Sequence, residues 1–138
     1  MIQGDSLSPY LFILFIDDVA DAIAAPNTKI YLYADDLAIT APCAPSLQMT
    51  LDSLSDWCQT SELEVNISKS KIMKFRKGGK LAWDDDFNFN GLPLDIVNEY
   101  CYLGVTLQTT LSFTKHIRKV KSNLWQQFTA SRTCNRWM

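Results

Sequence analysis

The chain has 138 residues, of which 47% are hydrophobic and 20% are charged, a composition typical of a globular domain rather than of a disordered segment. No apolar run is long enough to span a membrane, because the longest candidate, Leu11–Ile16, is followed at once by two aspartates. No secretion signal is recognisable. We therefore expect an intracellular protein, nuclear or cytoplasmic, that is not secreted and has no membrane partner.

The net charge of −2 conceals an uneven distribution of charge along the chain. Residues 1–68 carry ten acidic side chains and one basic one, whereas residues 69–80 carry six bases and no acid, and residues 100–138 carry six more bases and no acid. A polyanionic partner responds to such local clusters more than to the total charge. The acidic isoelectric point therefore does not exclude nucleic-acid binding.

The four cysteines do not suggest a metal site. They include no Cys-x-x-Cys pair, and the chain has one histidine, His116, which we expect to be a polar surface residue. A zinc site needs about four such ligands at short spacings. We expect reduced thiols, some of them buried, at Cys43, Cys58, Cys101 and Cys134.

In chain order, the first predicted helix begins at Ser8, which can cap it, and at Pro9, which suits its first position. Apolar residues recur at helical spacing as far as Ile23, and the helix should end near residues 25–27. Two β-prone runs on either side of residues 34–36 predict a hairpin. A second helix should follow, with an apolar face made of Leu47, Leu51, Leu54 and Cys58, and with Trp57 alongside.

The second half of the chain predicts shorter elements. Strands are expected near residues 63–66 and 72–76, a turn at residues 78–79, and a hairpin within residues 84–98 that turns at residues 91–93. Residues 100–107 should be strand-like. The last helix should start near Ser112, with Ile117, Val120, Leu124 and Phe128 facing inward and Lys115, Arg118, Lys119 and Lys121 outward. Strands and helices joined by hairpins predict an α+β fold.

Two adjacent aspartates, Asp35 and Asp36, stand at the tip of the first predicted hairpin. Like charges so close repel, and each carboxylate must stay hydrated or find a cation. Mg²⁺ prefers carboxylate oxygens as ligands, and a pair of such ions can activate an attacking hydroxyl and stabilise a leaving pyrophosphate. Acidic residues are also common in solvated turns, so this pair alone does not distinguish a metal site from a turn.

Four segments in order resemble the palm of a reverse transcriptase, closest to those of non-LTR (LINE-like) retrotransposons. Residues 3–12 resemble the family's Gln-Gly-x-x-x-Ser-Pro segment, and residues 33–36 (Tyr-Ala-Asp-Asp) resemble its metal-binding hairpin. Residues 63–71 resemble its Leu-x-x-Asn-x-x-Lys element, and residues 102–105 (Tyr-Leu-Gly-Val) resemble its primer-grip region. The likeness covers residues 2 to about 107, and the four motifs keep the family's order and spacing.

The resemblance implies a role for each matching residue. Asp35 and Asp36 would be catalytic metal ligands, for two Mg²⁺ ions in the intact enzyme with Mn²⁺ as an alternative. Lys69 would protonate the leaving pyrophosphate, although it could instead belong to a solvated basic run, and Lys71 is the second candidate for this role. The nucleotide and template would border Gln3, Gly4, Ser8, Pro9, Tyr33 and Ala34, and the primer would lie over Tyr102, Leu103 and Gly104.

The same resemblance implies a partial palm, with an antiparallel sheet and packed helices, over residues 1–110, and the start of a thumb or connection helix over residues 111–138. The implied partners are an RNA template, a DNA primer and deoxynucleoside triphosphates. In the family, the fingers and a third metal-binding aspartate precede the Gln-Gly segment, and Asp5, Asp17 and Asp18 are not obvious substitutes for that aspartate. We therefore expect a fragment of an RNA-directed DNA polymerase, a nucleotidyltransferase, that is inactive without the missing N-terminal palm and fingers segment.

Two other interpretations stay open. The chain could be a non-catalytic, nucleic-acid-binding remnant of a mobile element, or part of a reverse transcriptase resembling group II intron maturases, which share the Ala-Asp-Asp hairpin. The Tyr-Leu-Gly-Val segment and the spacing of Asn66 and Lys69 favour the retrotransposon enzyme.

Overall fold

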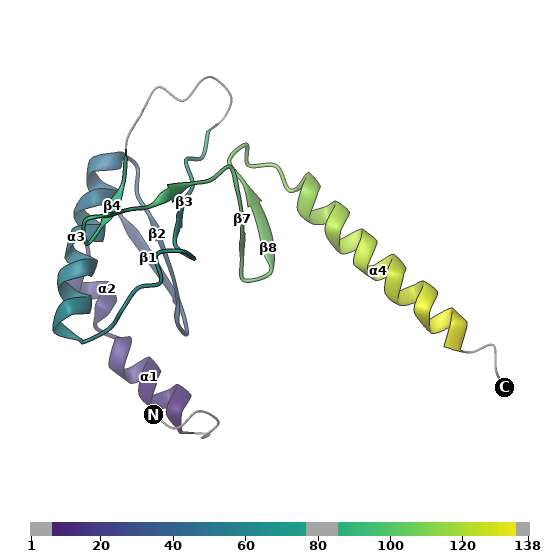
Figure 1. Ribbon diagram of the computed structural model, residues 1–138, viewed down its shortest axis with the longest axis horizontal. Coiled ribbons are helices and arrows are strands. Elements are labelled where there is room, and N and C mark those ends of the chain that lie inside the picture. Colours follow the sequence, from purple (N-terminus) through teal and green to yellow (C-terminus); the bar gives the residue numbers. More distant parts are fainter. Residues whose placement is uncertain (1–6, 77–85, 135–138) are drawn as a thin grey trace. The chain divides into compact units, whose positions relative to one another are not determined.

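The computed structural model describes residues 7–76 and 86–134, with side chains as far as Thr129 (Figure 1). Helices and short strands occur in separate runs along the described chain, and the strands pair as three antiparallel hairpins and one parallel pair. The fold class is therefore α+β, as predicted. The chain divides into two units: unit 1 comprises Met1–Ser70 and Asp85–Leu94, and unit 2 comprises Lys71–Asp84 and Asp95–Met138.

Unit 1 contains three helices and two hairpins in its described part. The helices are α1 (Ser8–Ile16), α2 (Val19–Ala22) and α3 (Ala44–Thr60). The first hairpin joins β1 (Lys29–Tyr33) to β2 (Asp36–Thr40), and the second joins β4 (Asn88–Phe89) to β5 (Leu92–Pro93). The chain turns in the second hairpin at Asn90 and Gly91, which both have positive φ, so the turn predicted at residues 91–93 is confirmed at Gly91, whereas Leu92 and Pro93 belong to β5.

The single first helix of the prediction is divided in two at Asp17 and Asp18. Both aspartates are exposed, and aspartate is a weak helix former because its carboxylate competes for backbone hydrogen bonds. The start of the helix also differs from the prediction. Ser8 is its first residue and Leu7 occupies the cap position, so no side-chain cap hydrogen bond forms.

The core of unit 1 gathers beneath α3. The predicted apolar face of this helix is confirmed at Leu51, Leu54 and Cys58, which are all buried. Gln48 attaches the second hairpin to α3, because its side-chain amide donates to the carbonyl of Asn88 (2.8 Å) and its Oε1 accepts from the Asn88 amide (3.1 Å). The other buried apolar side chains of this unit are Ile16, Val19, Ile23, Phe87, Phe89 and Leu94.

The strand predicted over residues 63–66 does not form. Side chains along this stretch alternate between half-buried and exposed, as in a strand, but within the described residues no neighbouring backbone pairs with it. A strand needs a hydrogen-bonded partner as well as the right pattern. The strand predicted over residues 72–76 is reduced to β3 (Lys71–Ile72), and the turn predicted at residues 78–79 lies outside the described residues.

Unit 2 consists of β3, β6 (Asp95–Ile96), β7 (Glu99–Tyr102), β8 (Val105–Gln108) and α4 (Thr114–Cys134). Strands β3 and β6 run parallel, whereas β7 and β8 form an antiparallel hairpin. The strand-like character predicted for residues 100–107 is confirmed in two strands, between which the chain reverses at Leu103 and Gly104, whose φ angles are +46° and +80°. Positive φ at both positions is typical of a type I′ turn between two strands.

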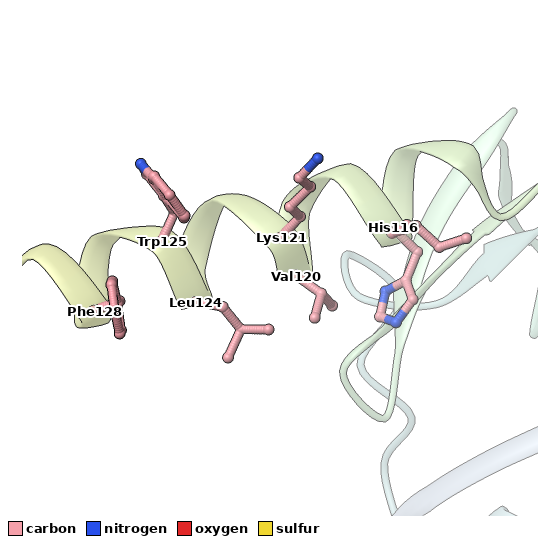
Figure 2. Close-up of a pocket in the computed structure, with 7 residues that line it drawn as sticks. His116, Val120, Lys121, Leu124, Trp125 and Phe128 are labelled. Carbon is pink, nitrogen blue, oxygen red and sulfur yellow. The ribbon is translucent and has the colours of Figure 1, made fainter.

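Helix α4 begins two residues after the predicted start and has the predicted faces, but its apolar face is not covered. The apolar residues expected to face inward are exposed, from 41% at Val120 to 63% at Ile117. Figure 2 shows Val120, Leu124 and Phe128 projecting from the helix, with Lys121 and Trp125 on another side. A single helix cannot enclose a ligand, so the hollow along this face is an open surface rather than a cavity.

No helix in the described part of the chain is both long enough and apolar enough to cross a membrane.

Candidate active site

The paired aspartates lie where the sequence predicted them, at the tip of the β1–β2 hairpin. Tyr33 and Asp36 are the last cross-strand pair, so Ala34 and Asp35 form a two-residue loop between them. All four residues are exposed. The register therefore places both aspartates, which are exposed, at the same end of the β1–β2 hairpin, whose ribbon is seen in Figure 1.

The loop holds a strained backbone at Ala34, which has a φ of +53°. A residue with a Cβ atom rarely adopts this left-handed conformation, and the cost is about 1 kcal/mol or more. Hairpins with two-residue loops need positive φ because that twist matches the twist of their strands. The strain therefore follows from joining β1 to β2 through only two residues, and it places Asp35 directly after a sharply turned position.

The donor chemistry at this tip suits a hard divalent cation. Within residues 7–76 and 86–134, neither Asp35 nor Asp36 forms an ion pair, so both carboxylates can accept a cation from solution. The same described residues contain no group of three His, Cys, Asp or Glu side chains that could hold a metal. The oxygen donors of Asp35 and Asp36 therefore suit a hard cation such as Mg²⁺.

Lys69 lies in a turn and not at the end of a strand. The turn is organised by Asn66, whose Oδ1 accepts from the Lys69 amide (3.1 Å) and from the Ser68 hydroxyl (2.7 Å). The carbonyl of Asn66 also accepts from the amide of Ser70 (3.0 Å). Asparagine favours such turns because its side chain can bond the backbone a few residues on. The spacing of Asn66 and Lys69 thus has a structural reason, since one residue folds the turn that presents the other.

Lys71 is not equivalent to Lys69. Its ammonium lies 2.6 Å from the Asp95 carboxylate, and its side chain is only 18% exposed. The two residues are also partners in the β3–β6 pair, so the backbone register holds the ion pair in place. Lys69 and Lys71 therefore do not lie on one extended segment, because residues 66–70 turn before β3 begins.

The remaining predicted site residues fall in different places. Ser8 and Pro9 open α1, whereas Gln3 and Gly4 lie outside the described residues. Tyr102, Leu103 and Gly104 form the end and turn of the β7–β8 hairpin in unit 2. The β1–β2 tip and Lys69 belong to unit 1.

Two features escaped the sequence analysis. His116 is half-buried, and its Nδ1 accepts a hydrogen bond from the backbone amide of Thr106. Cys43 lies at the cap of α3, where the hydroxyl and then the backbone amide of Ser46 stabilise its thiolate and lower the pKa of the thiol. Cysteine is not among the residues preferred at a helix cap, so nothing in the sequence signals the role of Cys43, and nothing local signals the partner of His116.

Comparison with known proteins identifies the family of the chain. The family model for reverse transcriptase (RNA-dependent DNA polymerase) matches residues 1–107. The chain is 27% identical to the RNA-directed DNA polymerase from mobile element jockey of Drosophila funebris, over 92% of this chain and 15% of that protein. It is 29% identical to the probable RNA-directed DNA polymerase from transposon BS of Drosophila melanogaster, over 91% of this chain and 15% of that protein.

A third relative is the retrovirus-related Pol polyprotein from the type-1 retrotransposable element R1 of Nasonia vitripennis, 28% identical over 84% of this chain and 37% of that protein. The chain thus spans about 15% of the length of its jockey and BS relatives. The family match covers most of the chain and includes the Tyr-Ala-Asp-Asp hairpin. The chain belongs to the reverse transcriptase (RNA-dependent DNA polymerase) family.

Proposed function

We propose that the chain supplies the metal-binding hairpin of an RNA-directed DNA polymerase of a non-LTR retrotransposon, which extends a DNA primer with deoxynucleoside triphosphates on an RNA template. The observation that carries the proposal is the position of Asp35 and Asp36, exposed and without an ion pair among the described residues, at the tip of a two-residue hairpin. The family match and the names of the relatives support it.

Each of the following residues would have its own role in the reaction. Asp35 and Asp36 would hold Mg²⁺, which when bound would help to activate the attacking hydroxyl and to offset the charge of the leaving pyrophosphate. Tyr33 and Ala34 would fix the direction of the hairpin beside the primer end. Lys69, exposed on its turn, would donate a proton to the leaving pyrophosphate, on which negative charge develops.

A second contribution would come from the basic helix α4. The four basic residues of its first two turns are exposed, and no acidic residue occurs in residues 100–138. Such a face would follow the phosphates of a primer–template duplex. The turn at Tyr102, Leu103 and Gly104 would lie under the primer strand, as the resemblance to the primer grip suggests. Residues 1–110 would then be palm, and residues 111–138 the start of the thumb.

We further propose that the 138 residues do not polymerise by themselves. Their described part offers two carboxylates at the hairpin and no set of three metal ligands, and they span about 15% of the jockey polymerase. The direct test replaces the corresponding segment of the jockey polymerase with these residues and measures DNA synthesis on an RNA template.

We expect the exchanged protein to extend the primer, and its Asp35→Asn variant to lose at least ~100-fold in rate, because one metal ligand is removed. Lys69→Leu should lose on the order of 100-fold as a missing general acid. Lys71→Leu is the matched control, since Lys71 is already paired with Asp95, and it should lose much less. An active exchange protein that is indifferent to Asp35→Asn would contradict the proposal.

Nucleic-acid binding alone is the second candidate function, and the basic face of α4 supports it. Titration of the 138-residue chain with labelled duplex at two salt concentrations separates it from the first. We expect weak binding without sequence preference that falls steeply as salt rises, because each phosphate contact releases counterions. If duplex binds at low salt but the exchanged protein shows no Asp35-dependent synthesis, the chain is a binding remnant and not part of an enzyme.

A further inference from the structure

A histidine holds the first turn of α4 against the outer edge of β8. The N–H of Thr106 donates to Nδ1 of His116 at 3.3 Å. Figure 2 shows the imidazole on the same side of the helix as Val120 and Leu124, at the end nearest the strands. Next to it, Lys115 forms an ion pair with Glu99 of β7. Two consecutive residues of α4 therefore contact both strands of the β7–β8 hairpin.

The register of the hairpin explains why Thr106 needs this partner. Tyr102 and Val105 flank a two-residue turn, so they form a hydrogen-bonded pair, and the next pair, Cys101 and Thr106, directs its N–H and C=O groups outward. The bond from the Thr109 amide to the Asn98 carbonyl (3.1 Å) follows the same alternation. Thr106 is only 7% exposed, so water has little access to its outward N–H. An unpaired amide in this position would destabilise the structure.

The bond also defines the state of the imidazole. A backbone amide can only donate, so Nδ1 of His116 must carry a lone pair and the ring must be neutral, with its proton on Nε2. A protonated ring carries hydrogens on both nitrogens, and its Nδ1 would then point a donor at a donor. Histidine is the side chain that makes this change between about pH 5 and 8.

Among the described residues, the charged groups around the imidazole give a protonated ring no unpaired anion. On α4 itself, Lys115, Arg118 and Lys119 lie within one turn of His116 and add positive charge. Strand β8 carries no charged side chain, and Glu99 of β7 is already paired with Lys115. The other titratable or basic groups on elements packed here are Tyr100, Cys101 and Tyr102 of β7 and Arg76, whose backbone bonds Thr109.

We infer that His116 is a pH-sensitive latch, which fixes the start of α4 to the β7–β8 hairpin when the imidazole is neutral and releases it when the imidazole is protonated. The attachment needs the lone pair of Nδ1, so it is present in the neutral ring and is lost when Nδ1 gains a proton. Every group involved belongs to unit 2, so the latch does not depend on the proposed polymerase function. If that function holds, the latch sets how α4 is held relative to the turn at Leu103 and Gly104.

NMR of the 138-residue chain between pH 5 and 8 tests the inference directly, because a chain with one histidine gives one unambiguous set of imidazole signals. We expect the Thr106 amide proton to move upfield along the same titration curve as the imidazole. Its protection against exchange, corrected for the intrinsic effect of pH, should fall about tenfold, as expected for one lost hydrogen bond.

Two variants separate the latch from a general effect of acid. His116→Asn keeps an oxygen acceptor near the position of Nδ1 but cannot titrate, so the Thr106 amide should stay bonded at both ends of the pH range. Glu99→Gln removes the neighbouring ion pair and should leave the Thr106 response unchanged. A Thr106 response that persists in His116→Asn, or wild-type chain in which the imidazole titrates while the Thr106 amide does not respond, overturns the inference.

Discussion

At the scale of single residues, the three cysteines whose side chains are described differ sharply in environment. Cys43 and Cys101 are exposed, whereas Cys58 is buried on the apolar face of α3. The Ser46 hydroxyl, 3.1 Å from the Cys43 sulfur, and the Ser46 amide lower the pKa of the Cys43 thiol, and burial raises the pKa of the Cys58 thiol. The thiolate is the reactive form, so the pKa and exposure together determine the rate of alkylation.

We therefore predict that Cys43 is alkylated first, Cys101 more slowly and Cys58 last, measured site by site with iodoacetamide and mass spectrometry near neutral pH. A lowered pKa leaves more thiolate at a given pH. The difference in alkylation rate between Cys43 and Cys101 should therefore become smaller as the pH rises above the usual thiol range. Ser46→Ala should remove most of the difference in alkylation rate by slowing the reaction at Cys43, while the rate at Cys101 stays unchanged. Equal rates at Cys43 and Cys101 in the wild-type chain would show that Ser46 does not stabilise the thiolate.

At the scale of elements, the β7–β8 hairpin depends on two residues with positive φ, of which only one is glycine. A Cβ atom placed on Gly104 would meet nothing within 4 Å, so any cost of Gly104→Ala comes from the backbone conformation and not from a clash. We predict that Gly104→Ala lowers the free energy of unfolding by about 1 kcal/mol.

The companion change is Leu103→Asn, since asparagine tolerates left-handed φ better than leucine and Asn-Gly is the preferred pair in this type of turn. We predict a gain of roughly 0.5 kcal/mol, because a strained leucine is replaced at an exposed position. Urea denaturation of the three chains under identical conditions gives both values. Destabilisation by Leu103→Asn would mean that the exposed leucine has a packing role that outweighs its strain.

The sequence predicted those elements whose evidence is local. The β1–β2 hairpin and the α3 face at Leu51, Leu54 and Cys58 depend on patterns within twenty residues, and both are confirmed. Residues 63–66 have the alternation of a strand, but a strand also needs a partner, which no local pattern reports. The acceptor role of His116 was missed for the same reason, because it depends on the register of a hairpin ten residues earlier.

In the candidate site, too, the sequence predicted the local features but not those that depend on distant residues. The tip at Asp35 and Asp36 was predicted from one short motif, because a two-residue loop carries its own geometry. The different environments of Lys69 and Lys71 were not predicted. They arise from the turn at Asn66 and from the pairing of β3 with β6, which brings Asp95, 24 residues away in the sequence, next to Lys71. Assignment of a catalytic lysine within a basic run therefore requires the fold.

At the scale of the whole molecule, apolar surface remains exposed on both units. Helix α1 is apolar on nearly all sides, yet Ile16 is its only buried residue, and Leu14 is 72% exposed. A helix that is hydrophobic all round is normally buried in a larger structure. Helix α4 adds a second exposed apolar face at Ile117, Val120, Leu124 and Phe128. Exposed patches of this kind promote association when nothing covers them.

We therefore predict that the 138-residue chain associates reversibly, and that the β1–β2 tip takes no part in the contact. Sedimentation velocity over a hundredfold range of concentration should show a rising mean mass. Leu11→Glu combined with Leu14→Glu places two charges on one face of α1, three residues apart, and should shift association to at least ~10-fold higher concentration, because two buried leucines would contribute a few kcal/mol to the contact. Asp35→Asn with Asp36→Asn is the control and should leave the association unchanged. A wild-type chain that stays monomeric throughout would mean that the exposed face of α1 is covered in solution by another part of the same chain.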